Sequence, residues 1–395
     1  MHPTGGSLRV FRQFAWLEVD SVRIALSRPT HQRVTPAVRR LVKRNMSKRI
    51  IEDIMLMKYP FKARFGLLTT LLLLVISSAC IPRTVETDVW INRGLEGDTI
   101  YSLAIDPKTP TTFYAGVYGD EGGVFKTIDG GENWNAANVG LTSVIINSLA
   151  IDPETPTTIY AGTGNRGIFK STNSGATWNA ANTGIPTGVV EVLVIDPTAP
   201  TTLYAGTSGY GVFKSTDGGA NWSATNTGMT KAFVSDLVID PSVPTTIYAG
   251  TLHGVFKTMD SGANWSATST DMTDIHVVAL AIDPITPTTM YAGTYSHGVF
   301  KSTNGGASWN TASTGLDWSL DILALVIDPK TPTTLYAGTF QLGVFKSMDG
   351  GESWSVFSAG LPANVVNALV FDPKKPTILY AGTWDHGAFA NHLGK

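Results

Sequence analysis

The sequence predicts a seven-bladed β-propeller, and three observations lead to this fold class. An octet of the form Ser/Thr-x-Asp/Asn-x-Gly-x-x-Trp occurs six times, with successive tryptophans 43 to 45 residues apart. The tripeptides Ile/Phe-Asp-Pro and Tyr-Ala-Gly each recur seven times at a similar spacing. Tandem units of about 44 residues, each with four short strands, are typical of propeller blades. The octets end on Trp134, Trp178, Trp222, Trp265, Trp309 and Trp354.

One unit shows the strands that we expect in every blade. Residues 148–151, 157–163, 167–171 and 177–181 have strand length and strand composition, and turn residues bound each run. Proline ends the first strand because it cannot donate to a ladder, and the preceding aspartate can bond its own backbone in a turn. The tyrosine, phenylalanine and tryptophan of each unit supply large apolar side chains for packing between blades. Each blade is therefore expected to be a four-stranded antiparallel sheet.

The number of octets indicates how the ring closes. The last unit has its Tyr-Ala-Gly element but ends at Lys395 without a fourth strand. Residues 89–92, Val-Trp-Ile-Asn, match the fourth strands of the other units, and Trp90 lies 44 residues before Trp134. We therefore expect the N-terminal strand, Val89–Asn92, to complete blade seven of a propeller that covers residues 89–395. Closure of this kind removes an exposed sheet edge.

The octet resembles the Asp-box, or BNR repeat, of sialidases, sortilin-type receptors, xyloglucan-cleaving glycosidases and photosystem II assembly propellers. Residues 127–134 and 215–222 match it most closely, and the resemblance covers about residues 89–390. It implies a propeller in which the box is a structural hairpin. A calcium loop is the alternative, but calcium takes 6–8 oxygen ligands and each octet offers one carboxylate or none. We expect no metal and no cofactor, and structural roles for Asp129, Asn173, Asp217, Asp260, Asn304 and Asp349.

The first 80 residues differ in charge from the remainder. They carry 14 Lys/Arg and 4 Asp/Glu, whereas residues 81–395 carry 15 and 27. Residues 1–56 form a basic segment without apolar periodicity, which we interpret as a mis-called translation start or a disordered basic tail. The acidic remainder argues against nucleic-acid binding, which needs a basic stripe to neutralise phosphates.

Residues 57–80 have the features of a secretory signal. Basic residues precede an apolar run of about 15 residues, 65–79, and small residues lead into the single cysteine, Cys80. The run is shorter than the roughly 20 residues of a membrane-spanning helix. It resembles a bacterial lipoprotein signal in which Cys80 is lipidated, although Ser77 stands where that family prefers leucine. Plain secretion and an uncleaved anchor are the alternatives. We expect residues 81–88 to be a linker and the protein to be exported, as a cell-envelope lipoprotein or in secreted form.

The loops between the second and third strands of each unit should lie on the face opposite the octets, and there the seven copies differ. These loops and one crossover are rich in aromatic, histidine and acidic residues. Flat aromatic faces with polar edges suit a sugar or a peptide. Free drift of surface loops is the alternative explanation, and histidines on different blades are too far apart to share ligand bonds of about 2.1 Å. The candidate binding residues are Tyr118, Arg166, Tyr210, His253, Tyr295, His297, Trp318, Phe340, Trp384, Asp385 and His386.

Enzymatic activity is less well supported than binding. The resemblance to sialidases implies an arginine triad, but after the signal the chain has only Arg83, Arg93 and Arg166. The xyloglucan-cleaving relatives place two aspartates between two propellers, and one propeller is expected here. A glycosidase needs two carboxyls about 5–9.5 Å apart. The candidates for such a glycoside hydrolase or lyase are Asp120, Glu121 and Asp385.

The leading hypothesis is a non-enzymatic, exported binding or scaffold propeller for a protein, peptide or glycan, with a lipid anchor as its only membrane contact. The first alternative is the glycoside hydrolase or lyase. The second is an assembly factor for a membrane complex, although the assembly-factor family uses an arginine-rich patch and only Arg166 falls in a candidate loop.

Overall fold

The computed structural model describes residues 10–11, 14–19, 22–25 and 88–394, apart from 120, 187, 230–232, 318 and 363. The chain divides into two compact units, Met1–Val85 and Glu86–Lys395. In the first unit, three strands form an antiparallel sheet in the order β1-β2-β3. They are β1 (Val10–Phe11), β2 (Phe14–Val19) and β3 (Val22–Ala25).

The secretory signal over residues 57–80, the lipidation site Cys80 and all of the linker except Asp88 lie outside the described residues. Within the described part of the chain, no helix is long and apolar enough to cross a membrane.

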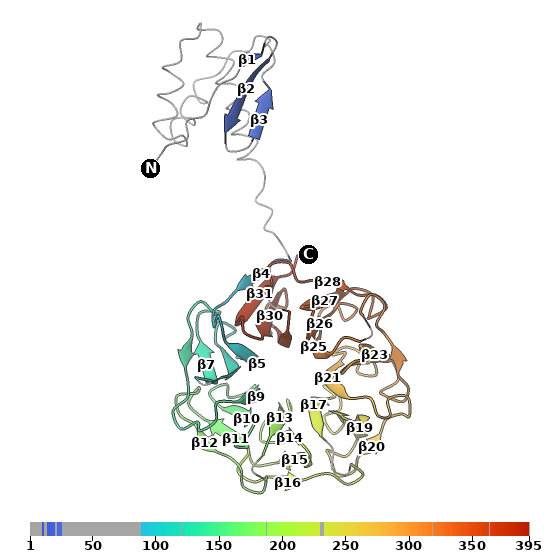
Figure 1. The fold of residues 1–395 in the computed structure, drawn as a ribbon. Helices are drawn as coiled ribbons and strands as arrows, with labels where there is room; N and C mark the ends of the chain where they lie inside the picture. The colour runs from blue at the N-terminus through green and yellow to red at the C-terminus, as the bar shows by residue number, and fades with distance from the viewer. Residues whose placement is uncertain are drawn as a thin grey trace. The chain divides into compact units, whose positions relative to one another are not determined.

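The second unit is a seven-bladed β-propeller of four-stranded antiparallel sheets, as predicted (Figure 1). The innermost strands are β5 (Thr99–Ile105), β9 (Ile146–Ile151), β13 (Val190–Ile195), β17 (Val234–Ile239), β21 (Val277–Ile282), β25 (Ile322–Ile327) and β29 (Val366–Phe371). The second strands are β6 (Phe113–Tyr118), β10 (Ile159–Thr163), β14 (Leu203–Thr207), β18 (Ile247–Thr251), β22 (Met290–Thr294), β26 (Leu335–Thr339) and β30 (Ile378–Thr383).

The two outer strands of each blade are shorter. The third strands are β7 (Gly123–Thr127), β11 (Ile168–Ser171), β15 (Gly211–Ser215), β19 (Gly254–Thr258), β23 (Val299–Ser302), β27 (Val344–Ser347) and β31 (Ala388–His392). The outermost strands are β8 (Asn135–Ala136), β12 (Asn179–Ala180), β16 (Ser223–Ala224), β20 (Ser266–Ala267), β24 (Asn310–Thr311), β28 (Ser355–Val356) and β4 (Trp90–Asn92). All seven sheets are built from Trp90 to His392, so a protein that starts at residue 81 keeps every strand of the propeller.

The ring closes through β4, as predicted. This strand pairs antiparallel with β31, and the two ends of the propeller lie side by side in Figure 1. The indole of Trp90 is 2% exposed and donates to the Phe357 carbonyl at 2.7 Å. Five of the six octet tryptophans bond in the same way to the preceding blade; for example, Trp178 donates to the Ala137 carbonyl at 2.7 Å. The indole of Trp309 donates to the Thr268 hydroxyl instead. Trp90 therefore takes the place of a seventh octet tryptophan.

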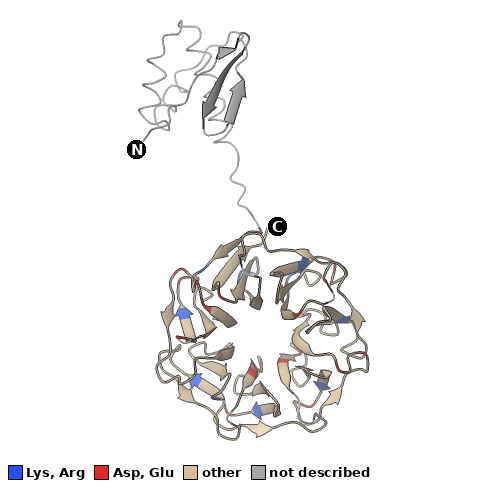
Figure 2. Cartoon of the chain, in the orientation of Figure 1, with Lys and Arg blue, Asp and Glu red and all other residues tan. Residues whose placement is uncertain are grey.

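The core lies in layers between adjacent blades, and the repeated tyrosines are at its centre. Tyr160 and Lys170 are cross-strand partners, and the lysine ammonium lies 5.3 Å from the centroid of the tyrosine ring. The Tyr160 hydroxyl and the Lys170 ammonium both donate to the Gly218 carbonyl in the octet turn of the next blade, at 3.0 and 2.7 Å. A lysine stands over a tyrosine in each of blades one to six, and Figure 2 shows these lysines around the ring. The Tyr-Ala-Gly and Val/Ile-Phe-Lys elements thus tie each of blades one to five to the octet of the next blade.

Blade seven departs from this pattern. Ala390 occupies the position of the lysine, and Asn391 that of the octet's first Ser/Thr. The Asn391 side chain is fully buried, and neither of its polar atoms has a hydrogen-bond partner among the described residues. Blades seven and one are therefore joined without the lysine contact, which places more of the closure on β4.

The octet turns lie on the same face as the Asp-Pro turns, and we name this the octet face. The Gly130 amide, for example, donates to the Thr111 carbonyl at 2.9 Å. Hydrogen bonds from the Asn133 side chain and backbone, and then from Thr127, lower the pKa of Asp129 to about 2. Asn173 accepts the equivalent backbone bond and donates its own amide to the Thr177 hydroxyl, so either residue completes the turn.

The octet aspartates make the propeller sensitive to acid. A carboxyl whose pKa is lowered on folding stabilises the folded state above its unfolded pKa, and this contribution is lost as pH falls through the folded pKa, here between about 4 and 2. Asp349 has a pKa of about 2, lowered first by Ser353. Because a serine, Ser308, also partners the natural asparagine Asn304, Asp349→Asn should keep the turn.

We therefore expect urea unfolding of Asp349→Asn to show unchanged stability at pH 7 and a smaller loss between pH 5 and pH 2.5 than in the parent protein. An identical loss in both proteins would contradict this role for Asp349.

Candidate functional site

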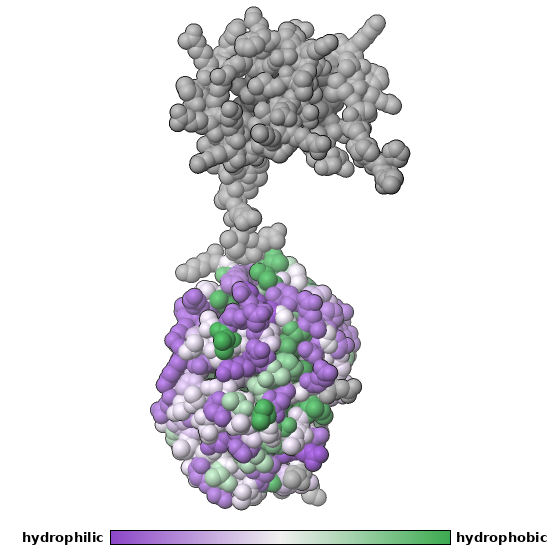
Figure 3. Space-filling view, turned by 90° about the vertical axis from the view of Figure 1, so that its left-hand side faces the viewer, coloured by the Kyte–Doolittle hydropathy of each residue, from purple (hydrophilic) through white to green (hydrophobic). Residues whose placement is uncertain are grey.

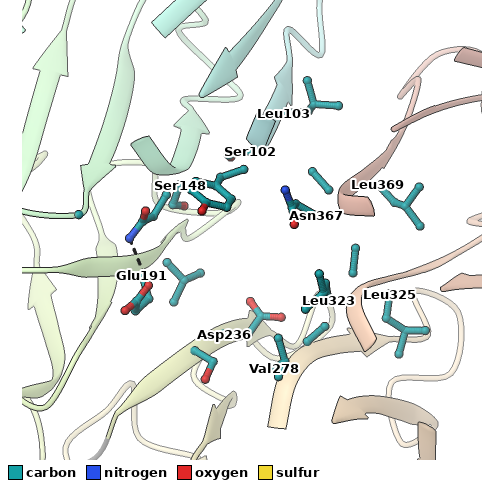
Figure 4. Close-up of a pocket in the computed structure, with 18 of the residues that line it drawn as sticks. Ser102, Leu103, Ser148, Glu191, Asp236, Val278, Leu323, Leu325, Asn367 and Leu369 are labelled. Carbon is teal, nitrogen blue, oxygen red and sulfur yellow. Dashed lines mark hydrogen bonds between the residues drawn. The ribbon is translucent and has the colours of Figure 1, made fainter. Parts of the chain in front are cut away.

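The innermost strands surround a cavity of about 680 Å³ in the central channel (Figure 4). All seven of these strands contribute to its wall. Tyr118, the last residue of β6, and Gly164, the first residue after β10, also line it. The cavity therefore reaches the face that carries the loops between second and third strands, which we name the loop face. These loops span residues 119–122, 164–167, 208–210, 252–253, 295–298, 340–343 and 384–387.

One side of the cavity is acidic. Asp236 on β17 accepts the Leu237 amide at 2.8 Å and the Leu280 amide of the next blade at 2.7 Å. Burial raises the pKa of Asp236 to about 7, against the opposing effect of these two bonds. Glu191 on β13 accepts the Asn147 amide at 3.2 Å, and burial raises its pKa as well.

The opposite side of the cavity is apolar. Val278, Leu323, Leu325 and Leu369 come from the innermost strands of blades five to seven. Figure 4 shows Leu325 and Leu369 across the channel from Glu191, and Val278 and Leu323 next to Asp236. No lysine or arginine is among the described residues that line this space. The cavity can therefore hold a ligand with an apolar part and a polar or cationic part.

Two aromatic groups lie where the cavity meets the loop face. Tyr101 packs against Trp384 of blade seven at 6.2 Å between ring centroids, and against Tyr118 at 5.7 Å. Farther round the ring, His276 lies between Phe233 and Tyr295, each at 5.9 Å.

Each of these aromatic groups bridges neighbouring blades and carries polar atoms at its edge. The His276 Nε2 lies 3.2 Å from the Ser235 hydroxyl. Burial lowers the pKa of His276, while the Asp321 carboxylate opposes the shift.

The structure places five of the predicted aromatic residues on the loop face. They are between 40% and 53% exposed, although Trp384 and Tyr295 also pack against residues of the cavity. Arg166 is exposed as well, and Trp318 lies outside the described residues. The five are Tyr118, Tyr210, Tyr295, Phe340 and Trp384.

The three predicted histidines of the loop face each have a local partner. His253 lies 3.2 Å from an Asp274 carboxylate oxygen. In His297 and His386, Nδ1 lies 3.0 and 2.9 Å from the carbonyl two residues earlier. Among the described residues, no group of three or more histidine, cysteine or acidic side chains could hold a metal ion.

The two candidate catalytic carboxylates that the structure describes, Glu121 and Asp385, have different surroundings. Asp385 accepts the Thr99 hydroxyl at 2.8 Å, its own amide donates back to that hydroxyl at 3.1 Å, and its φ of 58° places it in a tight turn. Glu121 is exposed and lies near Asp98, whose pKa is raised by burial and then by Glu121. Asp120 lies outside the described residues. In this structure Asp385 is part of the contact between blades seven and one.

No protein-family model and no curated protein matches this chain. Similar solved structures include the GH74 xyloglucanase from Xanthomonas campestris, with a TM-score of 0.63 and 19% identity over 77% of this chain and 53% of that one. This chain thus spans about half the length of the xyloglucanase. YCF48 bound to D1 peptide has a TM-score of 0.57 and 16% identity, covering 78% of this chain and 97% of that one.

An extracellular domain of a putative one-component system from B. thetaiotaomicron has a TM-score of 0.60 and 16% identity. It covers 78% of this chain, which spans 40% of that one. At these identities the likeness shows the seven-bladed propeller fold alone.

Proposed function

We propose that this chain is an exported binding protein that holds a protein, peptide or glycan ligand across its loop face, over the mouth of the channel. The observation that carries this proposal is the pair of aromatic groups around Tyr101 and His276, which join exposed loop residues to the wall of a large cavity. Ligand sites are concave, mostly apolar and equipped with a few polar groups, and this mouth has all three features.

The distribution of variation between the two faces supports the proposal. The octet face repeats one hydrogen-bonded turn six times, whereas the loop face presents a different set of side chains in every blade. Function concentrates in loops that a rigid scaffold positions. Two structures with the same fold, a YCF48 bound to D1 peptide and an extracellular domain, are consistent with a ligand-binding role outside the cytoplasm.

Export and anchoring rest on the sequence. The apolar run before Cys80 supports secretion, and lipidation of Cys80 would hold the propeller at the cell envelope. Lipidation is tested by metabolic labelling with a fatty-acid analogue, which Cys80→Ser should abolish.

A glycoside hydrolase is the second candidate, favoured by the likeness to the GH74 xyloglucanase and by acidic residues at the junction of blades seven and one. The hydrogen bonds of Asp385 with Thr99 argue for a structural role of that residue. An assembly factor for a membrane complex would be a special case of the binding function.

Array binding and hydrolysis assays on the protein of residues 81–395 distinguish these functions. Peptide and glycan arrays should yield a ligand that is released unchanged. Trp384→Ala should weaken its binding at least about tenfold, since a central aromatic anchor commonly contributes about 2 kcal/mol or more. Ile128→Ala, an exposed change on the octet face, is the control and should leave binding unaltered. Turnover of a glycan that is lost in Asp385→Asn would establish the hydrolase instead.

A further inference from the structure

We infer that the channel cavity binds the cationic side chain of a lysine or arginine that a polypeptide ligand inserts from the loop face. This inference rests on the proposed function for the position of the ligand, and it adds the chemical class of the group that enters the channel.

The first argument is the charge of the cavity wall. Glu191 and Asp236 are the two carboxylates among its described lining residues, and no described lysine or arginine forms an ion pair with either. Buried carboxylates are normally paired with a cation or fully hydrogen-bonded. Glu191 has one side-chain hydrogen bond, from Asn147, so most of its acceptor capacity faces the channel.

The second argument is that the fold does not require an acid at position 236. Ser102 and Ser148 occupy the equivalent positions of blades one and two, and each hydroxyl accepts the amide of the next blade's leucine at 3.0 Å. Asp236 makes the same bond to Leu280. Blade three has Val192 there, and blades five to seven have alanine, as Ala324 in blade six. A neutral residue is thus sufficient for the contact between blades, and the carboxyl adds a titratable acceptor to the channel.

The third argument is the apolar side chains that line the same cavity. A lysine or arginine side chain packs its aliphatic stem on apolar surface and places its charged end among acceptors. The stem would contact Val278 and Leu323, and the charged end would reach Glu191 and Asp236. The amide nitrogen of Asn367 donates to the Ile100 carbonyl at 3.1 Å, which leaves its oxygen as a further acceptor.

The position of the acids favours a polypeptide over a neutral glycan. A cation adds the attraction of opposite charges to its hydrogen bonds with these carboxyls, whereas a neutral sugar offers them hydroxyl donors alone. Exposed aromatic residues around the mouth, such as Tyr118 and Trp384, can pack on the peptide backbone that carries the inserted side chain.

Capped pentapeptides of the form Gly-Gly-X-Gly-Gly test the inference with the protein of residues 81–395. Titration calorimetry or ligand-observed NMR should show that peptides with X as lysine or arginine bind at least about tenfold more tightly than those with norleucine or acetyl-lysine, the size of one charge-assisted hydrogen bond. Equal binding of the lysine and norleucine peptides would overturn the inference.

Two variants test the acids themselves. Glu191→Gln keeps an acceptor for Asn147, and Asp236→Ser copies the natural contact of Ser102. Each should lower affinity for the lysine peptide about tenfold and leave the norleucine peptide unaffected. Glu132→Gln, an exposed change on the octet face, should alter neither. If Asp236→Ser fails to fold, Glu191→Gln decides the question alone, and unchanged lysine-peptide affinity in this variant would overturn the inference.

The outcomes also separate this inference from the proposed function. Binding of a neutral glycan on the array, with no preference among the pentapeptides, would overturn the channel inference and leave the loop-face function standing. Loss of lysine-peptide affinity in Glu191→Gln but not in Trp384→Ala would support the channel site and contradict the role of the loop face.

Discussion

Replacing Trp90 by alanine should lower the free energy of unfolding of the propeller by about 3–5 kcal/mol, the usual cost of truncating a large buried aromatic side chain. Trp90 is 2% exposed, donates to the Phe357 carbonyl at 2.7 Å and meets the Phe357 ring edge-on at 6.2 Å. It anchors a strand of three residues, β4, through which blade seven is completed. The loss of one side chain therefore weakens both a blade core and the closure of the ring.

Urea denaturation of the protein of residues 81–395 measures this effect. Trp384→Ala is the matched control, because Trp384 is 40% exposed on the loop face and its removal should cost less than about 1 kcal/mol. Deletion of residues 81–95 should be more severe and abolish the single cooperative transition. If Trp90→Ala unfolds at the same urea concentration as the parent protein, then β4 does not hold the ring closed.

The number of blades and the mode of closure could be predicted because both leave local signals in the sequence. Asp-Pro, Tyr-Ala-Gly and the octet each mark a turn or a close packing contact, and these recur in register. The last repeat has no octet, and Trp90 near the start of the propeller belongs to no octet. Together these observations indicate that both ends of the propeller contribute strands to one blade. The pairing of Trp90 with Asn391 confirms that inference.

The channel residues could not be predicted in the same way, because the predicted start of the innermost strand was wrong. The apolar run suggested a strand over 148–151, but β9 begins two residues earlier, at Ile146. Asn147 interrupts the apolar pattern, yet its backbone continues the strand while its side chain faces the channel. The position of Asn147 carries Glu191 in blade three and varies among the other blades, whereas the position before it is isoleucine or valine in all seven.

The sequence of a single repeat also does not show which residues of neighbouring blades are in contact. Tyr101 meets Trp384 only because the ring closes, since the two residues are nearly the whole propeller apart in sequence. His276 and Phe233 approach because their blades are neighbours. A repeat reveals what its copies share, whereas this site is made from what they do not share.

The crossovers between blades should be as sensitive as the closure. Gly184 lies between blades two and three with a φ of +87°, and a Cβ added there would lie 2.0 Å from the Trp222 carbonyl oxygen. Gly184→Ala should therefore destabilise the propeller by about 3 kcal/mol or more, from backbone strain of about 1–2 kcal/mol and overpacking of about 1–3 kcal/mol. Urea denaturation again provides the measurement.

Gly97 supplies the control that separates these two costs. Its φ is +86°, but nothing lies within 4 Å of an added Cβ, so Gly97→Ala should show the backbone strain alone. Equal destabilisation by the two variants would mean that the crossover yields easily to the added methyl group. We expect Gly184→Ala to cost more because the one crossover with a side chain at this position makes a different contact. In blade four, Asp271 is at the equivalent position, and its carboxylate accepts the Trp309 amide at 3.2 Å. In blade two, the Thr183 carbonyl accepts the corresponding amide of Trp222, and the side chain is absent because the two backbones are in contact.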